Sequence, residues 1–276
     1  MSRQERRARL KQNIGAIARR GMDLSAARSD QLWQVIACTR LLIDILDGKS
    51  PARASDAAKR AHEFFEISLK HNPSDHRIAC AKGCGFCCHL RVAAMPAEIF
   101  HLANHIRREF KHDIEIVIAR LRAADAQSRG LDGRERTKRH VPCGMLVDNA
   151  CSVYAARPSP CRALTSISVE TCKRGYDGED VDIMTPAVWT EIRSAHNQAL
   201  WAALQHAGLS SAAYELNHAL LVALETPNAE ARWLAGEDVF KDVDRDDTMD
   251  ESLKKKVCDR LIAGALGKEL PPWESA

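Results

Sequence analysis

The sequence lacks an apolar run long enough to cross a membrane. Its most apolar stretch, LWQVIACTRLLIDIL at residues 32–46, contains Arg40 and Asp44, whereas a membrane-spanning helix needs about 20 mostly apolar residues. The basic start of the chain is not followed by an apolar stretch of the length that a signal peptide requires. We therefore expect a cytoplasmic protein without a membrane partner.

The chain also has little net charge, +3 over 276 residues. A protein that binds nucleic acid over a wide surface would be more basic, so there is no strong signal for that class. Basic residues do gather in the first 20 positions, opposed only by Glu5. A solvated helix face is the simplest interpretation, and contact with an acidic partner, RNA or a membrane surface is the alternative. No segment identifies a protein partner.

Standard catalytic motifs are missing as well. The sequence has no Ser-His-Asp order, phosphate loop, dinucleotide fingerprint or HExxH, so the common hydrolase and nucleotide chemistries have no support. Strand patterns do not alternate with helical ones, and no internal repeat occurs. These absences leave open whether the protein is an enzyme.

Helical periodicity dominates both ends of the chain. It covers 10–17 and 32–46, and Ser50-Pro51 is a good start for a third helix that Asn72-Pro73 closes. The remaining helices are predicted at 96–110, 113–129, 186–207, 210–225, 228–235 and 249–265. The polar, glycine-punctuated segment 130–140 is expected to be an exposed loop.

The predicted fold class is therefore all-α, a helical bundle-like arrangement with an irregular, loop-rich cysteine-cluster centre. Composition divides the chain into three parts, with the cysteines concentrated in the middle one. The expected parts are an N-terminal helical region at 1–75, a cysteine-cluster metal-binding domain at 76–180 and a C-terminal helical region at 181–276.

Cysteine is what the middle of the chain has in abundance. Eight of the ten cysteines form two groups of four: Cys80, Cys84, Cys87, Cys88, and then Cys143, Cys151, Cys161, Cys172. Two sets of four thiols suit tetrahedral thiolate sites for zinc, or iron–sulfur clusters. Four disulfides or scattered buried thiols are the weaker interpretations, since a reducing compartment keeps thiols free and the cysteines are densely clustered. The isolated Cys38 is expected to be a buried, packed thiol.

The adjacent pair Cys87-Cys88 suggests more than one metal. Neighbouring side chains point in different directions on a strand or a helix, so two of them on one tetrahedral ion would strain the backbone. We expect Cys88 to serve a second centre or to bridge two ions, and one metal with a reserve thiol is the alternative. The C-x3-C-x2-C spacing also occurs in radical S-adenosylmethionine enzymes, but the strand–helix alternation of their barrels is missing here.

The second group lies in CGMLVDNACSVYAARPSPCRAL, residues 143–164. A C-x3-C-x2-C-C block followed by C-x-x-L and C-S-V-Y-x-x-R-P-x-x-C-R resembles the YkgJ-type cysteine-cluster family, also called the CxxCxxCC zinc- or iron-chelating domain, over roughly residues 78–175. The matching positions are Cys80, Cys84, Cys87, Cys88, Cys143, Leu146, Cys151, Tyr154, Arg157, Pro158, Cys161 and Arg162.

This resemblance implies a metal-chelating domain that binds zinc or iron, with an iron–sulfur cluster among the options. Relatives include flagellin lysine methylases, by analogy only. The alternative function is therefore an iron–sulfur or non-haem iron enzyme, for example with a methylase-like activity. Its substrate, a protein or a small molecule, would be held by the flanking helices.

Two arginines and a tyrosine accompany the second cysteine group. A divalent ion with four thiolates carries net negative charge, which is costly to bury without nearby cations. Arg157 and Arg162 are therefore expected to lie near the sulfurs as compensating donors. Tyr154 is expected to be a core ring.

Histidines are secondary candidates. Glu98, His101 and His105 share one helical face at a spacing usable by a di-iron or zinc site, although a solvated face is the simpler interpretation. His89 follows the first cysteine group directly, and it is a candidate to replace one thiol as a ligand.

Overall fold

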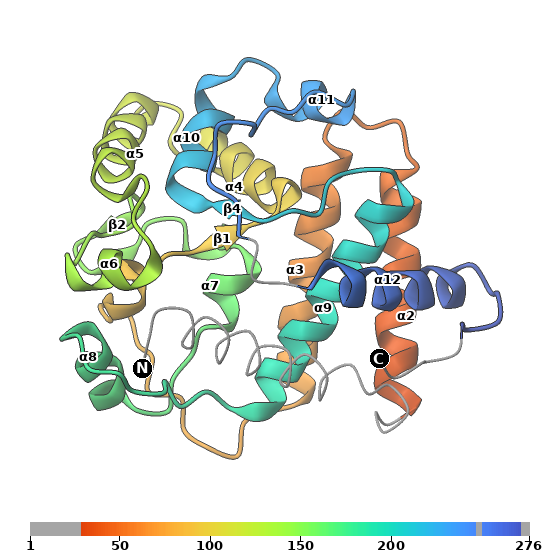
Figure 1. Cartoon of the computed structure of the whole chain (residues 1–276), viewed down its shortest axis with the longest axis horizontal. Helices are drawn as coiled ribbons and strands as arrows, with labels where there is room; N and C mark the ends of the chain where they lie inside the picture. Colours follow the sequence, from red (N-terminus) through yellow and green to blue (C-terminus); the bar gives the residue numbers. More distant parts are fainter. Residues whose placement is uncertain (1–28, 247–249, 272–276) are drawn as a thin grey trace.

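The computed structural model describes residues 29–246 and 250–271 (Figure 1). Helices make up most of this part, and the few strands are two residues long. The all-α fold class is thus confirmed. The helix expected at 10–17 and the basic residues of the first 20 positions lie outside the described residues.

The α-helices are, in chain order, α2 (Ser29–Leu46), α3 (Arg53–His71), α4 (Pro96–Glu109), α5 (Ile114–Ser128), α6 (Gly133–Lys138), α7 (Ser159–Ala163), α8 (Val169–Tyr176), α9 (Ala187–His206), α10 (Leu216–Glu225), α11 (Ala229–Leu234) and α12 (Glu251–Ala265). Two 3-10 helices are η1 (Phe86–His89) and η2 (Tyr154–Ala156). The strands are β1 (Ala93–Ala94), β2 (Leu146–Val147), β3 (Ala150–Cys151) and β4 (Tyr214–Glu215). β1 pairs antiparallel with β4, and β2 with β3.

Most of the expected helices are confirmed, and their ends follow local chemistry. α3 ends directly before Asn72-Pro73, and α4 begins at Pro96 with the Glu98 side chain accepting the Met95 N–H at 3.1 Å. The helix expected at 210–225 begins later, at Leu216. The physical reason is that Tyr214 and Glu215 instead pair with β1, which fixes an extended backbone there.

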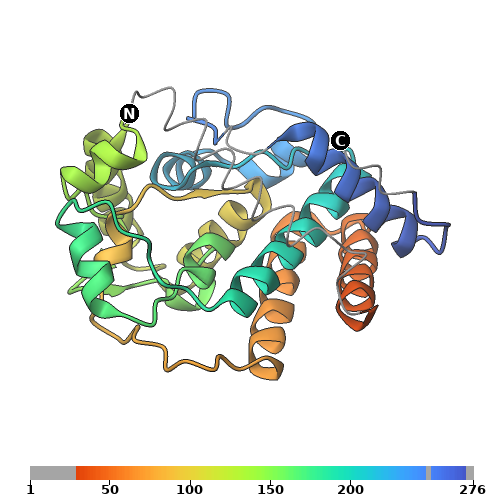
Figure 2. The same ribbon diagram turned by 60° about the horizontal axis from the view of Figure 1, so that its bottom comes forward.

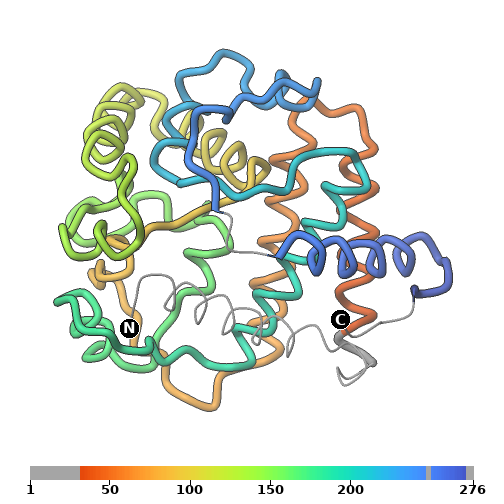
Figure 3. The backbone as a smooth tube through the Cα atoms, viewed as in Figure 1, coloured from red at the N-terminus to blue at the C-terminus, as the bar shows by residue number. Residues whose placement is uncertain are grey.

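The long helices supply most of the apolar core. α2, α3 and α9 lie side by side, and α12 crosses α2 and α9 (Figures 1 and 3). α4 packs on α3 and α10, and α10 also packs on α5. The core joins side chains from all three expected segments, for example Leu42, Phe100 and Leu220, each at most 1% exposed. Cys38 lies in this core, as predicted, and is 1% exposed.

The irregular, cysteine-rich middle segment of the chain lies on the opposite side of the molecule from α2 and α12. α5, α6 and α8 gather there, with α7 between them and the long helices (Figure 2). Within the described ranges, none of the helices combines the length and the apolar character needed to cross a membrane.

Candidate metal centre

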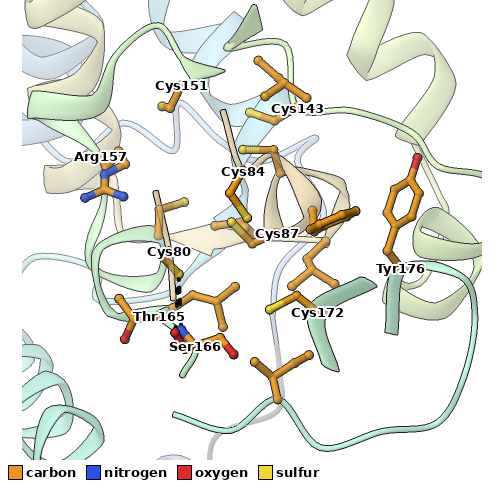
Figure 4. A pocket seen from close by; sticks show the side chains of 18 of the residues that line it. Cys80, Cys84, Cys87, Cys143, Cys151, Arg157, Thr165, Ser166, Cys172 and Tyr176 are labelled. Carbon is orange, nitrogen blue, oxygen red and sulfur yellow. Dashed lines mark hydrogen bonds between the residues drawn. The ribbon is translucent and has the colours of Figure 1, made fainter. Parts of the chain in front are cut away.

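All eight cysteines of the two sequence groups line one cavity of about 1340 Å³ (Figure 4). The first group comes from residues 80–88 and the second from residues 143–172, so the fold closes a gap of more than 50 residues. All eight are free thiols, most of them half-buried. The remaining two, Cys38 and Cys258, are buried elsewhere and do not line this cavity.

A β-hairpin brings Cys143 and Cys151 to the cavity. Leu146 pairs with Cys151 across β2 and β3, and the connecting Asp148 and Asn149 have φ angles of 48° and 56°. Two successive left-handed residues make the tight hairpin turn that matches strand twist, and Asp and Asn tolerate that conformation. The Cys143 N–H donates to the Cys88 carbonyl at 2.7 Å, which ties the hairpin to η1.

α8 brings Cys172 to the first cysteine group. This helix packs against η1, where the Tyr176 ring meets the rings of Phe86 and His89 at centroid distances of 5.4 and 4.9 Å. Ser168 caps the helix by accepting the Thr171 N–H at 3.2 Å. The aromatic contact therefore places Cys172 beside the first cysteine group, although 83 residues separate it from Cys88 in the sequence.

Backbone N–H groups donate to several of the sulfurs. The Ser166 N–H reaches Cys80 Sγ at 3.3 Å (Figure 4). Cys84, Cys143 and Cys151 each accept from the N–H two residues later in the chain. Such donors stabilise negative charge on sulfur, and hydrogen bonds to sulfur tune thiolate metal sites. At Cys84, Cys143 and Cys151 burial raises the thiol pKa, and these donors offset part of that rise.

The thiols fall into two sets of close neighbours. Burial, and then repulsion by Cys84, Cys87 and Cys172, raises the pKa of Cys80. The pKa of Cys161 is raised by burial and then by repulsion from Cys143, Cys151 and Cys87. Cys84 has the same neighbours as Cys80, namely Cys87 and Cys172, and Cys88 lies near Cys143 and Cys151. One set thus holds Cys80, Cys84, Cys87 and Cys172, and the other holds Cys88, Cys143, Cys151 and Cys161.

The two sets meet at the adjacent pair. A hydrogen bond from Cys88 lowers the pKa of Cys87 to about 7, and the Arg157 guanidinium also favours the Cys87 thiolate. The same bond, together with burial, raises the pKa of Cys88. Cys87 also neighbours Cys151 and Cys161. Cys87 and Cys88 therefore lie close together, and Cys87 lies between the two sets.

Arg157 lies at the cavity near several sulfurs, and its positive charge favours the thiolates of Cys87, Cys151 and Cys161. Its guanidinium stacks on the Tyr154 ring, 3.5 Å from the centroid. The expectation that Tyr154 is a core ring is wrong, because the residue is 64% exposed. The ring serves instead as a platform that holds Arg157 by a cation–π contact.

Arg162 also lines the cavity, but its hydrogen bonds go to oxygen. It pairs with Glu66 at 2.7 Å and donates to the carbonyls of Arg157, at 2.6 Å, and Ala155. Ala155 lies in η2, and Arg157 lies in the chain that links η2 to α7. Arg162 therefore fixes the turn that precedes Cys161, in addition to placing a buried positive charge at the cavity wall.

The segment 130–140 is largely exposed, as its composition indicates, but it is not a loop throughout. It contains α6, whose N-cap Asp132 accepts the Glu135 N–H at 2.9 Å. Arg136 lines the cavity, is almost fully buried and pairs with Glu215 at 2.6 Å. A buried guanidinium needs such a partner, and Glu215 lies on β4, which the local sequence cannot reveal.

The histidine candidates do not form a metal site in the structure. Glu98 is 1% exposed and is bonded to His62, so the solvated helix face expected for Glu98, His101 and His105 is wrong at Glu98. His89 bonds to the Gly85 carbonyl at 3.1 Å. His62 carried no sequence signal, because it lies on another helix.

The flanking helices complete the cavity wall. Leu69 comes from α3, Leu102 from α4, Trp189 from α9 and Asn217 from α10. Asn217 also accepts the Gly144 N–H at 3.2 Å beside Cys143. The Thr165 hydroxyl lies buried at the same wall and has no hydrogen-bond partner among residues 29–246 and 250–271.

Gly144 allows the hairpin to approach α5 closely. A Cβ at this position would lie 2.9 Å from both Cα and Cδ2 of Leu121, which is fully buried. We expect Gly144→Ala to lower the free energy of unfolding by about 1–3 kcal/mol, since overpacking forces backbone shifts. Denaturant unfolding of the purified chain measures this.

Gly133→Ala is the matched control for that substitution. Its Cβ would meet only the Cβ of Arg91, at an ordinary 3.8 Å, so stability should not fall. Equal unfolding free energies for the two variants would contradict the close approach of Gly144 to α5.

The donor set suits a thiophilic metal, although the free thiols are not closed around an ion. In the part of the chain that the structure describes, no three His, Cys, Asp or Glu side chains are already arranged to hold one. Eight thiols, N–H donors to sulfur and an adjacent guanidinium nevertheless provide the chemistry that zinc and iron–sulfur sites use.

Comparison with known proteins gives one match. No curated protein and no solved structure is matched by this chain. Residues 79–177 match the model of the CxxCxxCC family, whose description is "Putative zinc- or iron-chelating domain". All eight cavity cysteines lie inside the matched residues. The resemblance indicated by the cysteine pattern is therefore confirmed: residues 79–177 are similar to the CxxCxxCC domain.

Proposed function

We propose that the protein binds zinc or iron through the thiolates of Cys80, Cys84, Cys87, Cys88, Cys143, Cys151, Cys161 and Cys172. The observation that carries this proposal is that these eight cysteines, which come from distant parts of the sequence, line one cavity. Scattered structural thiols would be buried separately, as Cys38 and Cys258 are.

The two sets of neighbouring thiols favour two metal centres. Cys80, Cys84, Cys87 and Cys172 would hold the first, and Cys88, Cys143, Cys151 and Cys161 the second. Four sulfurs per centre is the usual complement for zinc and for iron–sulfur clusters. The contact between Cys87 and Cys88 would make the centres immediate neighbours, with Cys87 able to bridge them.

Nearby cations support this arrangement electrostatically. Two tetrathiolate centres with divalent ions would carry about −2 charge each, and buried negative charge needs compensation. Arg157 supplies it beside Cys87, Cys151 and Cys161, and Arg136 beside Cys143. Arg162 would contribute through its buried charge and through the turn that it holds.

Absorption spectroscopy tests which chemistry the thiolates supply. Anaerobically purified full-length protein should be brown if it holds iron–sulfur clusters, whereas zinc leaves it colourless. Loading with Co²⁺ should give sulfur-to-cobalt charge-transfer bands in the zinc case. Protein that shows neither a chromophore nor cobalt–thiolate bands would refute thiolate metal binding.

The size of the cavity favours a second candidate function. About 1340 Å³ exceeds the roughly 300–1,000 Å³ typical of pockets for small ligands, and metal ions fill little of it. Apolar side chains of the flanking helices, including Leu69 and Trp189, line the remaining space. An iron–sulfur or non-haem iron enzyme whose substrate contacts these helices would use such a space, and a methylase-like activity on a protein is one example.

An open coordination position separates the two candidates, since closed four-thiolate sites are structural and open ones are catalytic. Adding imidazole or cyanide to Co²⁺-loaded protein should shift its absorption bands only when a position is open. Unshifted bands at saturating ligand would favour the purely structural, metal-binding role.

A further inference from the structure

Glu98 has a carboxylate that is buried in the protein interior, where the loss of hydration makes an ionised group unfavourable. It lies on α4, is 1% exposed and packs between α3 and α7. An ionised group at such a place needs several donors to offset its lost hydration. Burial acts to raise its pKa, but the hydrogen bond and charge of His62 and the donors of Ser159 hold the pKa of Glu98 below its usual range. The carboxylate is therefore ionised at neutral pH.

Its strongest contact is with α7, the short helix that carries Cys161. Glu98 Oε1 accepts the Ser159 N–H at 2.7 Å, and the Ser159 hydroxyl also contacts the carboxylate. Ser159 is the first residue of α7 and lies two positions before Cys161. A five-residue helix has almost no stability of its own, so this anchor from the core helps to fix the position of Cys161, together with the bonds of Arg162 and the packing of α7 on α9.

His62 holds Glu98 from the other side. Its Nε2 is 3.1 Å from Glu98 Oε1, and the residue is 3% exposed. The other ring nitrogen, Nδ1, has no hydrogen-bond partner within the described residues, so the ring position is determined by Glu98. Glu98 Oε2 accepts the Met95 N–H at 3.1 Å. The carboxylate of α4 is therefore held by donors from α3, from α7 and from the start of its own helix.

We infer that Glu98, supported by His62, is a positioning residue that places Cys161 for metal binding at the second centre. This inference rests on the proposed function. It assigns a role to a buried charge that the thiolate chemistry alone does not use. The first centre, formed by Cys80, Cys84, Cys87 and Cys172, has no hydrogen bond to Glu98 among those that the described residues make.

Glu98→Gln tests the inference on the full-length chain loaded with Co²⁺. The amide is neutral and has only one oxygen for the donors that two carboxylate oxygens now accept, so the hold of this residue on α7 should weaken. We expect the affinity for one of two Co²⁺ ions to fall about 10–100-fold, the usual loss when the support of a metal ligand is removed. The charge-transfer band of the other ion should stay unchanged.

Glu230→Gln is a matched control. Glu230 is also a partly buried carboxylate, which accepts the Ser55 N–H at 2.8 Å in the first turn of α3 and the Asn104 amide at 3.1 Å. It does not line the cavity. This variant should bind both ions like the unaltered chain, so equal losses in the two variants would overturn the positioning role.

Ser159→Pro provides a second test if Glu98→Gln folds poorly. Proline removes both the N–H and the hydroxyl donor to Glu98, and the first position of a helix tolerates it. The same selective loss of one Co²⁺ is expected, whereas full binding of both ions by either variant would overturn the inference. If the unaltered chain takes up no Co²⁺ or iron at all, the proposed function itself is wrong, which is a different result.

Discussion

Removal of the metal should unfold the segment between Cys80 and Cys172 before the rest of the protein. This segment contains only short helices besides α4 and α5, and two-residue strands. Structural thiolate sites contribute on the order of 10 kcal/mol to folding. The layer of α2, α3, α9 and α12 has its own apolar contacts, and it should outlast the loss of metal.

Limited proteolysis with mass spectrometry measures this effect. A strong chelator under reducing conditions should produce cleavages that concentrate between residues 80 and 172, outside the core helices α4 and α5, and helicity should fall only in part. Chelator that is saturated with zinc beforehand is the control. Unchanged proteolysis and circular dichroism after complete metal removal would show that the cavity folds without metal.

The second large effect concerns the adjacent cysteines. Cys87→Ser, like Cys80→Ser or Cys84→Ser, should remove most metal from the first centre, since a tetrahedral site loses one of its four ligands. Cys88→Ser should spare that centre and lose the second metal or the bridge, because Cys88 neighbours Cys143 and Cys151. Metal per chain for each variant, together with titration of free thiols, measures the difference.

Cys38→Ser is the control for these variants, since Cys38 is buried in α2 away from the cavity and a helical serine can bond to the preceding turn. It should retain all the metal. If Cys87→Ser and Cys88→Ser lose the same metal to the same extent, all four thiols of the first sequence group serve one cluster.

The long helices could be predicted because periodicity and end signals agree there. Pro96 starts α4, and Asn72-Pro73 follows the end of α3. The short α7 and α8 carry too few residues to show a period, and tertiary contacts hold them. The hairpin was missed although Asp148-Asn149 is a usable turn signal, since its strands are only two residues long.

The cysteine pattern predicted the metal-binding domain, but spacing cannot pair ligands across the chain. Cys172 joins the first set because Tyr176 packs on η1, a contact between residues far apart in the sequence. Glu98 illustrates the same limit. Its helical face is polar in sequence, and only the positions of His62 and Ser159 show that this face is covered.

The metal content of anaerobically purified, full-length protein tests the central claim most directly. Elemental analysis should find zinc or iron at about two ions per chain for mononuclear centres, and more for iron–sulfur clusters. The metal should fall away in a variant in which all eight cavity cysteines are replaced by serine. A contradictory result would be protein that is fully reduced and folded but contains less than about one-tenth of an ion per chain, because each centre offers four ligands to its ion.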